Sequence, residues 1–192
     1  MKNRTKILML IALFGCIAAL AQDAKIEKVE LSEPYTPLYI DGEEGLTTIQ
    51  VRGLVATGTS DKKWFRIVTE YSTSAEWLDR LTIEYYVLFP GETVVFKGVL
   101  NYIDLQEKRD HLSEVYLHFN TYARHYARGT IQYAVVVLID GKQVDFQTNK
   151  RSPENWWKEM PVNPCGLLPR EFTPFVVFNV ERFEARDHCS WQ

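Results

Sequence analysis

The chain has 192 residues and a formal net charge of −3, and 46% of its residues are hydrophobic. This length suits one domain with a substantial hydrophobic core. The mildly acidic charge and the lack of a Lys/Arg cluster argue against a nucleic-acid-binding protein.

The N-terminus has the pattern of a secretory signal peptide. Basic residues in the first six positions precede an apolar run over residues 7–20, and Ala19 and Ala21 are the small residues that a signal peptidase reads. The run is shorter than the roughly 20 residues that span a bilayer comfortably. We therefore expect residues 1–21 to be removed, which leaves an exported single domain, residues 22–192, without a transmembrane segment.

The three cysteines fall into two groups. Cys16 follows Leu-Phe-Gly in a pattern that resembles a bacterial lipobox, so its acylation stays open as an alternative to cleavage after Ala21. Cleavage after Ala21 leaves only Cys165 and Cys189, and two cysteines in an oxidising compartment most often pair. Closing such a loop stabilises the fold by roughly 3–4 kcal/mol in the chain-entropy model. We expect a Cys165–Cys189 disulfide.

Alternation of apolar and polar residues predicts a series of strands. In chain order these are residues 25–31, 46–57, 64–71, 81–87, 93–102, 131–139, 142–148 and 174–183. Asp140-Gly141 between two of them is the strongest short hairpin signal in the chain. The elements predict an all-β fold, an immunoglobulin-like β-sandwich of seven to eight strands with at most one short helix.

Two segments fit that pattern less well. Leu112–Tyr126 has apolar residues at the spacing of one helical face, but its first half also alternates as a strand would, so both interpretations stay open. Residues 155–160 suit a short helical turn.

The titratable residues form no recognised catalytic or metal-binding motif. His111, His118 and His125 are seven residues apart, which on a helix is about 10 Å of rise and too far to share one ion. The sequence has no nucleophile elbow, phosphate loop or dinucleotide fingerprint. We expect no catalytic residue, no cofactor and no metal ion, and keep a motif-free hydrolase only as a third alternative.

Four aromatic residues are candidates for binding. Trp64 and Tyr86 fall on the faces of their strands that we expect to point outward, and Trp156 and Trp157 lie in a loop. Exposed aromatic rings stack on sugars or anchor protein interfaces. The competing interpretation is that they bury the second face of the sandwich, because few large aromatics stay exposed.

The second half of the chain, from Asn101 onward, resembles a known group of proteins. Arg124-His125-Tyr126, Asp140-Gly141-Lys142, Trp156-Trp157 and the stretch from Cys165 to Phe175 are similar to exported immunoglobulin-like proteins encoded beside type IV pilus machinery. The resemblance implies an immunoglobulin-like sandwich and a role in pilus assembly or surface attachment. It supplies no catalytic residues.

These observations lead to one principal hypothesis and one alternative. The principal hypothesis is a non-enzymatic protein of the periplasm or cell surface, including the outer membrane's surface, that binds envelope or pilus proteins or itself. The alternative is a carbohydrate-binding surface module that uses the exposed aromatics, with a glycan as its partner. We also expect the segment Gln22–Leu31, an easily exchanged strand at the mature N-terminus, to serve assembly rather than core stability.

Overall fold

The structure is a computed structural model that describes residues 23–41, 54–125, 129–149, 153, 155–164 and 166–177. The expected signal peptide and all three cysteines, Cys16, Cys165 and Cys189, lie outside these residues, so the expected cleavage, acylation and disulfide stay predictions. No helix in the described part of the chain has the length and apolar character needed to cross a membrane.

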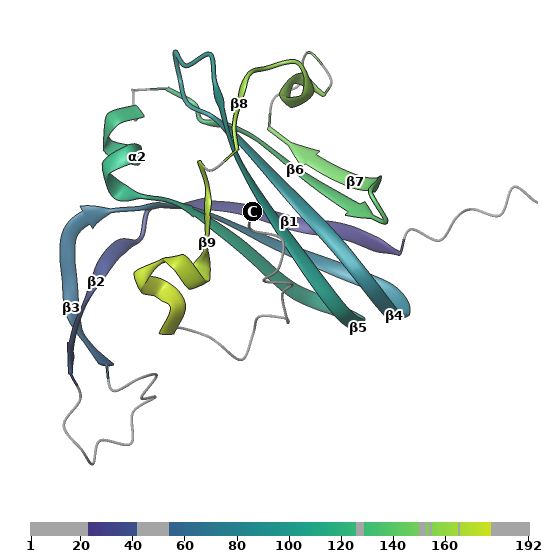
Figure 1. Cartoon of the computed structure of the whole chain (residues 1–192), viewed down its shortest axis with the longest axis horizontal. Coiled ribbons are helices and arrows are strands. Elements are labelled where there is room, and N and C mark those ends of the chain that lie inside the picture. The colour runs from purple at the N-terminus through teal and green to yellow at the C-terminus, as the bar shows by residue number, and fades with distance from the viewer. Residues whose placement is uncertain are drawn as a thin grey trace, which may run out of the picture.

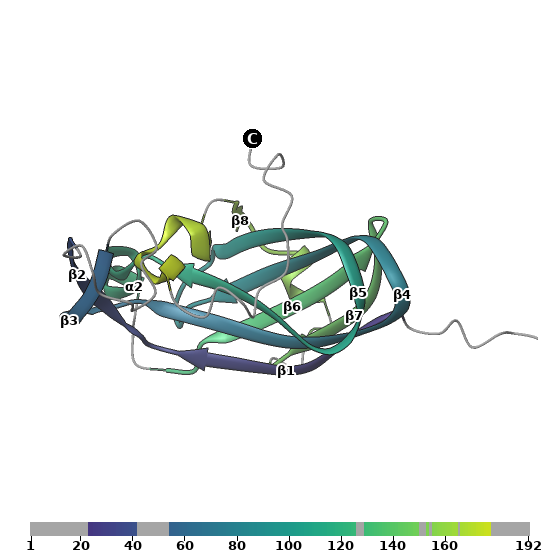
Figure 2. The same ribbon diagram turned by 90° about the horizontal axis from the view of Figure 1, so that it is seen from below.

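Two very long strands form the framework of the fold. β4 (Phe65–Leu88) has 24 residues and β5 (Val95–Leu117) has 23. A straight strand of that length would extend about 80 Å, far more than the width of a domain of this size. Both strands bend instead, and register shifts between Tyr71 and Trp77 mark the bend. Figure 2 shows β4 and β5 curving from one layer to the other at one end of the molecule.

Each half of the β4–β5 hairpin is widened into one layer of a sandwich. The further strands of the two layers are β1 (Ala24–Ser32), β6 (Gln132–Ile139), β7 (Lys142–Thr148), β8 (Val162–Asn163) and β9 (Leu168–Pro169). In one layer β1 pairs with the first half of β4, and β9 with the end of β5. In the other, β6 pairs with the second half of β4, β7 with β6, and β8 with the start of β5 (Figure 1). The predicted all-β sandwich is confirmed.

The core lies inside the curve of the two long strands. The side chains predicted to point inward from β4 are each at most 1% exposed: Phe65, Ile67, Tyr71, Leu81, Ile83, Tyr85 and Val87. The sequence pattern assigned them to two separate strands, which is wrong, since one bent strand carries both sets. The predicted hairpin between β6 and β7 is confirmed, with Asp140 and Gly141 at φ values of 51° and 74° in the tight turn.

β1 is an integral strand of the sandwich. It pairs with β4 along its length, and its residues Ala24 and Ile26 are only 1% and 7% exposed. The backbone N–H of Ile26 also donates a 2.7 Å hydrogen bond to the Asp145 carboxylate on β7, which links the two layers at this edge. The expectation that Gln22–Leu31 lies outside the core is therefore wrong for the described residues, because this strand contributes buried side chains, and its part in assembly stays a prediction.

The two ambiguous segments are settled by the backbone. Leu112–Tyr126 contains both predicted elements in succession, because β5 continues to Leu117 and helix α2 (Phe119–His125) follows. A short 3₁₀ helix, η1 (Trp156–Lys158), confirms the predicted helical turn. Two more 3₁₀ helices follow: η2 (Arg170–Phe172), and η3 (Pro174–Val177), which lies where the last strand was predicted to start. That strand prediction is wrong over Pro174–Val177, where the chain turns to pack Phe175 on Tyr116, with ring centroids 4.8 Å apart.

Candidate binding pocket at the base of the β2–β3 arm

A two-stranded ribbon extends beyond the sandwich. β2 (Tyr35–Asp41) and β3 (Leu54–Lys63) form a separate antiparallel sheet and, within the described residues, pair only with each other. We call this ribbon the arm. It continues the β1–β4 ladder, since the Trp64 backbone N–H donates a 2.9 Å hydrogen bond to the Pro34 carbonyl at the junction. Figure 1 shows the arm standing off the sandwich on the side of α2.

Trp64 fastens the arm to the sandwich. Its side chain is only 3% exposed and packs edge-on against the rings of two phenylalanines and a tyrosine, besides His118. The ring centroids lie 5.8 Å from Phe175, 6.4 Å from Tyr116 and 5.8 Å from Phe119. Such aromatic pairs stabilise packing by about 0.5–1.5 kcal/mol each beyond the area that they bury. The indole is therefore a structural anchor between the arm, the outer face of β5 and the C-terminal turns.

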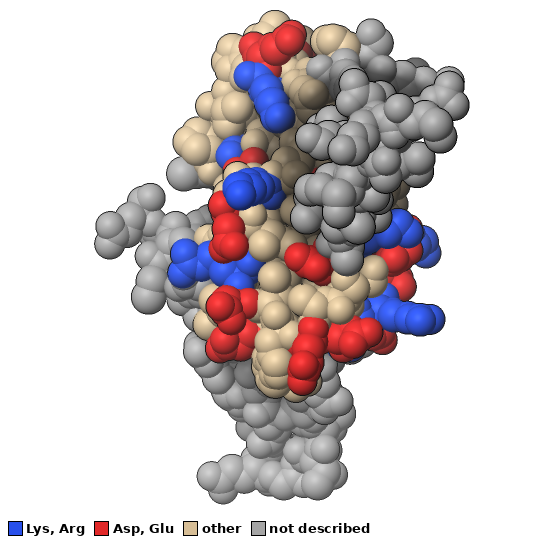
Figure 3. Space-filling view, turned by 90° about the vertical axis from the view of Figure 1, so that its right-hand side faces the viewer, with Lys and Arg blue, Asp and Glu red and all other residues tan. Residues whose placement is uncertain are grey.

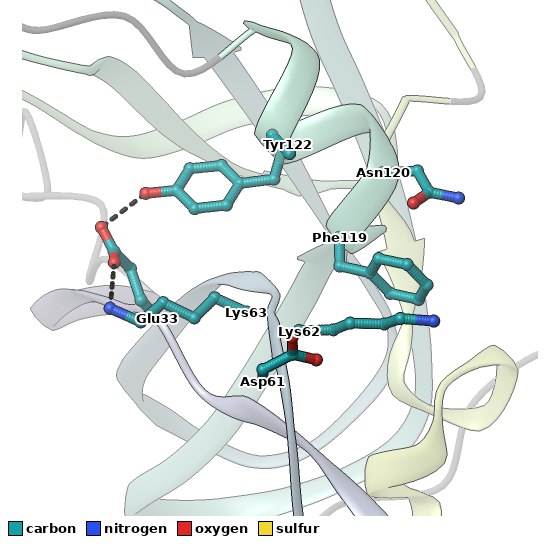
Figure 4. A pocket seen from close by; sticks show the side chains of 8 residues that line it. Glu33, Asp61, Lys62, Lys63, Phe119, Asn120 and Tyr122 are labelled. Atoms are coloured by element: carbon teal, nitrogen blue, oxygen red, sulfur yellow. Dashed lines mark hydrogen bonds and ion pairs between the residues drawn. The ribbon is translucent and has the colours of Figure 1, made fainter.

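A pocket opens between the base of the arm and α2. Its volume is about 610 Å³, and Figure 4 shows the side chains around it. The lining comes from the β1–β2 junction, the end of β3 and one side of α2: Glu33, Asp61, Lys62, Lys63, Phe119, Asn120, Tyr122 and Ala123. These three segments are far apart in sequence, and the fold brings them together.

Glu33 organises one wall of the pocket. Its carboxylate accepts a 2.5 Å hydrogen bond from the Tyr122 hydroxyl of α2 and lies 3.7 Å from the Lys63 ammonium group of β3. The Lys63 ammonium also lies 5.2 Å from the centre of the Tyr35 ring. The hydrogen bond to Tyr35 and the nearby Glu33 carboxylate raise the pKa of Lys63 above its usual value. Glu33 thus links the arm to α2 and fixes the separation of the two pocket walls.

The opposite wall combines a cation with an aromatic ring. The Lys62 ammonium group lies 4.7 Å from the centre of the Phe119 ring, within the range of a cation–π contact. The His118 ring lies beside them, tilted against Phe119 at a centroid distance of 4.1 Å and edge-on to Trp64 at 4.8 Å. Burial lowers the pKa of His118, and the charge of Lys62 lowers it further. This wall therefore favours a neutral imidazole next to a positively charged lysine.

The lining suits recognition of a polar segment. It presents two carboxylates, two ammonium groups and the Asn120 amide beside two aromatic rings. The pocket therefore contains both positively charged hydrogen-bond donors and negatively charged acceptors. A polypeptide segment offers a matching mixture of backbone donors and acceptors with apolar side chains. Among the described residues, no group of three or more His, Cys, Asp or Glu side chains is placed to hold a metal ion.

The four aromatic residues proposed for binding are buried. Trp64 is 3% exposed, Tyr86 7%, and Trp156 and Trp157 1% each. Trp64 and Tyr86 point away from the sandwich core, and of the two interpretations the structure supports burial, because other segments cover these outward faces. The η1 turn places Trp157 over Tyr86, with ring centroids 6.2 Å apart, and Trp156 donates a 3.2 Å hydrogen bond to Thr148. The tryptophan pair therefore forms a second hydrophobic cluster outside the sandwich core.

The histidines have separate roles in the fold. The His111 side chain is buried, 2.9 Å from the Thr73 hydroxyl and 3.1 Å from the Gln106 carbonyl at the strand bend. His125 lies 2.9 Å from the Glu92 carboxylate, which ties the end of α2 to the β4–β5 turn. The structure does not bring the three evenly spaced histidines together.

The pocket itself was not predicted from the sequence. Two features of the sequence contribute to it: the charged run Asp61-Lys62-Lys63 ahead of Trp64, and the aromatic residues of Leu112–Tyr126, the segment that suited either a helix or a strand. Neither pattern indicates that they meet, because their contact depends on the bend of β4 and β5 and on the start of α2 after Leu117.

Comparison with known proteins places the chain in a family. No curated protein matches the sequence, but three solved chains match the structure. One is a crystal structure of a protein from Akkermansia muciniphila, 18% identical in sequence with a TM-score of 0.62, covering 85% of this chain and 92% of that chain. This likeness shows a shared fold. A family model matches residues 18–188, nearly the whole chain, and the chain therefore belongs to the family that this model describes.

Proposed function

We propose that this protein is a non-enzymatic, exported component of the bacterial envelope that acts in pilus assembly or attachment through protein–protein contacts. Two lines of support come from the chain itself. The second half resembles exported immunoglobulin-like proteins encoded beside type IV pilus machinery, and the sandwich is the fold that this resemblance implies. The arm and its pocket supply a surface on which such contacts can form.

The observation that carries the proposal is the arm with the open hollow at its base. An isolated two-stranded ribbon is marginally stable in water, and its open strand edges can pair with another chain. A partner segment that adds to the arm would gain main-chain hydrogen bonds, and its side chains would reach the 610 Å³ pocket beside α2. Backbone pairing supplies affinity in this mode, and the pocket supplies selectivity.

The carbohydrate-binding alternative depended on aromatic side chains that are buried in the structure. Trp64, Tyr86, Trp156 and Trp157 are all buried, so none of them offers a free ring face for a sugar. We therefore do not propose it for this protein, and a glycan partner becomes an outcome that the experiment below would reveal.

Site-specific crosslinking in a native host tests the proposal. A photoreactive amino acid replaces Asn120, which is exposed in the pocket wall, and a matched variant carries it at the exposed Glu159 near η1. We expect the Asn120 probe, but not the Glu159 probe, to crosslink a pilus subunit or pilus assembly protein. Crosslinks only to glycan, or equal and weak crosslinking from both positions, would contradict the proposed function.

A further inference from the structure

β7 ends one layer of the sandwich and, among the described residues, pairs only with β6. The strand order in that layer is β7–β6–β4–β5–β8, so one side of the β7 backbone forms an open sheet edge. Its segment Gln143–Thr148 contains the apolar residues Val144 and Phe146 and a single charged residue, Asp145. An open edge with so little charge is a template for pairing with a strand of another chain.

The Asp145 carboxylate occupies backbone donors of two outer strands at once. Its Oδ1 accepts a 2.9 Å hydrogen bond from the Phe146 backbone N–H of β7. Its Oδ2 accepts a 2.7 Å hydrogen bond from the Ile26 backbone N–H of β1, which belongs to the other layer. A strand that paired with β7 at this point would have to displace the carboxylate.

The strands are irregular on both sides of this carboxylate. β1 shifts its register between Ile26 and Lys28, and the β6–β7 ladder shifts between Val137 and Leu138. Asp145 is paired with Val137, which is buried in the core, so its side chain points from β7 toward the other layer. Bulges and inward-pointing charges are two means by which natural sheets keep their edges from pairing.

We infer that the β7 edge is a self-pairing surface for a second copy of this chain, and that Asp145 keeps it closed. Two copies related by a twofold axis would add β7 to β7 in antiparallel order. Pairing centred on the middle of Lys142–Thr148 places the two Asp145 side chains opposite each other, so their charges oppose it as well. The inference is independent of the proposed function, which concerns the arm.

The charge around this edge supports the same role for Asp145. Figure 3 shows Lys, Arg, Asp and Glu side chains interspersed over the end of the molecule that carries the β6–β7 turn. Such a mixture of charges keeps exposed surfaces from associating. Without Asp145, the segment Gln143–Thr148 would carry no charge at all and would keep its two apolar side chains.

Sedimentation velocity of the purified chain without its expected signal peptide, residues 22–192, tests the inference over a range of concentrations. Asp145→Ala removes both acceptor oxygens, and Asp145→Asn removes the charge and one of them. The matched control is Asp140→Asn in the exposed turn of the same hairpin, where asparagine tolerates the positive φ. Each copy of Asp145→Ala frees one Phe146 N–H, and a hydrogen bond is worth roughly a factor of two to ten, so dimerisation should be about tenfold tighter than in the wild type. Asp145→Asn should lie between them, and Asp140→Asn should match the wild type.

Hydrogen exchange locates the contact. In Asp145→Ala the amides of Gln143–Thr148 should exchange more slowly as the protein concentration rises, while those of α2 should not change. Equal self-association of Asp145→Ala and the wild type would overturn the inference, as would a dimer that leaves the β7 amides unprotected. Loss of the cooperative thermal transition in both Asp145 variants would overturn it too, because the carboxylate would then hold the fold together rather than keep the edge closed.

Discussion

A buried ion pair holds the C-terminal turns on the sandwich, and breaking it should destabilise the whole domain. Arg170 of η2 has its Nε 3.2 Å from Glu114 Oε1 on β5, and the two side chains are only 7% and 4% exposed. The same Nε donates a 3.0 Å hydrogen bond to the Phe175 carbonyl. The segment just before η2 also packs closely on β5, since a Cβ added to Gly98 of β5 would come within 2.8 Å of the Leu167 Cβ. The perturbation that we consider is Glu114→Gln.

The magnitude follows from the charge that remains behind. Glu114→Gln removes the Glu114 charge from beside the buried Arg170 guanidinium, and breaking such a pair from one side costs about 3–5 kcal/mol. Arg170 keeps its bond to the Phe175 carbonyl, which places the expected cost at the lower end of that range. The second contact of Glu114, 3.9 Å to the 34% exposed Arg66, adds little because water screens it. We expect the free energy of unfolding to fall by about 3 kcal/mol.

Urea denaturation followed by circular dichroism measures this change. The matched control replaces both partners, Glu114→Met/Arg170→Met, and should lie within about 1 kcal/mol of the wild type, because an apolar pair of similar volume leaves no buried charge. The reasoning would be refuted by a Glu114→Gln variant as stable as the wild type. It would also be refuted by a double variant that loses as much stability as the single one.

Three further predictions follow from other parts of the molecule. Deleting residues 22–32 removes the β1 ladder and its buried side chains, so calorimetry should show that the cooperative transition is lost; a truncated domain that melts near the full-length temperature would contradict the role of β1. In an NMR titration His118 should have a pKa below its usual 6.5, so stability should decrease as the pH falls below 6.5, where the unfolded chain takes up the proton first. Lys62→Met should raise that pKa, and an unchanged value would rule out the influence of Lys62. Protein exported from a native host and denatured without reductant should have no thiol to alkylate, and labelled Cys165 and Cys189 would count against the disulfide.

Local pattern was enough to predict most of the sandwich. The inward faces of β4, the β6–β7 hairpin and the η1 turn each depend on neighbouring residues in one or two elements. The failures have a common cause. Period-two alternation cannot show that residues 64–71 and 81–87 belong to one bent strand, because the bulged bend between them interrupts the pattern. It also cannot show what covers an outward face, so both exposure and burial stayed open for Trp64 and Tyr86, which the C-terminal turns and η1 cover.

The pocket lay further from what the sequence can predict. Glu33, Lys63 and Tyr122 come from three separate segments, and the hydrogen bond between Glu33 and Tyr122 spans 89 positions. No local periodicity encodes such a meeting, which depends on where β5 ends and α2 begins. Trp77 of β4 is 56% exposed at the register shift of the bend, which the alternation pattern does not reveal.

The central claim is that the hollow at the base of the arm binds a protein partner of the envelope, and blocking that hollow tests it most directly. Ala123 is an exposed residue of the pocket wall on α2, so Ala123→Arg fills the hollow without entering the core. One strain of a native host would carry Ala123→Arg on the chromosome, and a second strain would carry the control Glu159→Arg. Surface pili and attachment would be measured in both strains. We expect Ala123→Arg to reduce pilus assembly or attachment at unchanged protein level and melting temperature, with the control like the wild type. Normal pili and normal attachment in the Ala123→Arg strain would contradict the account.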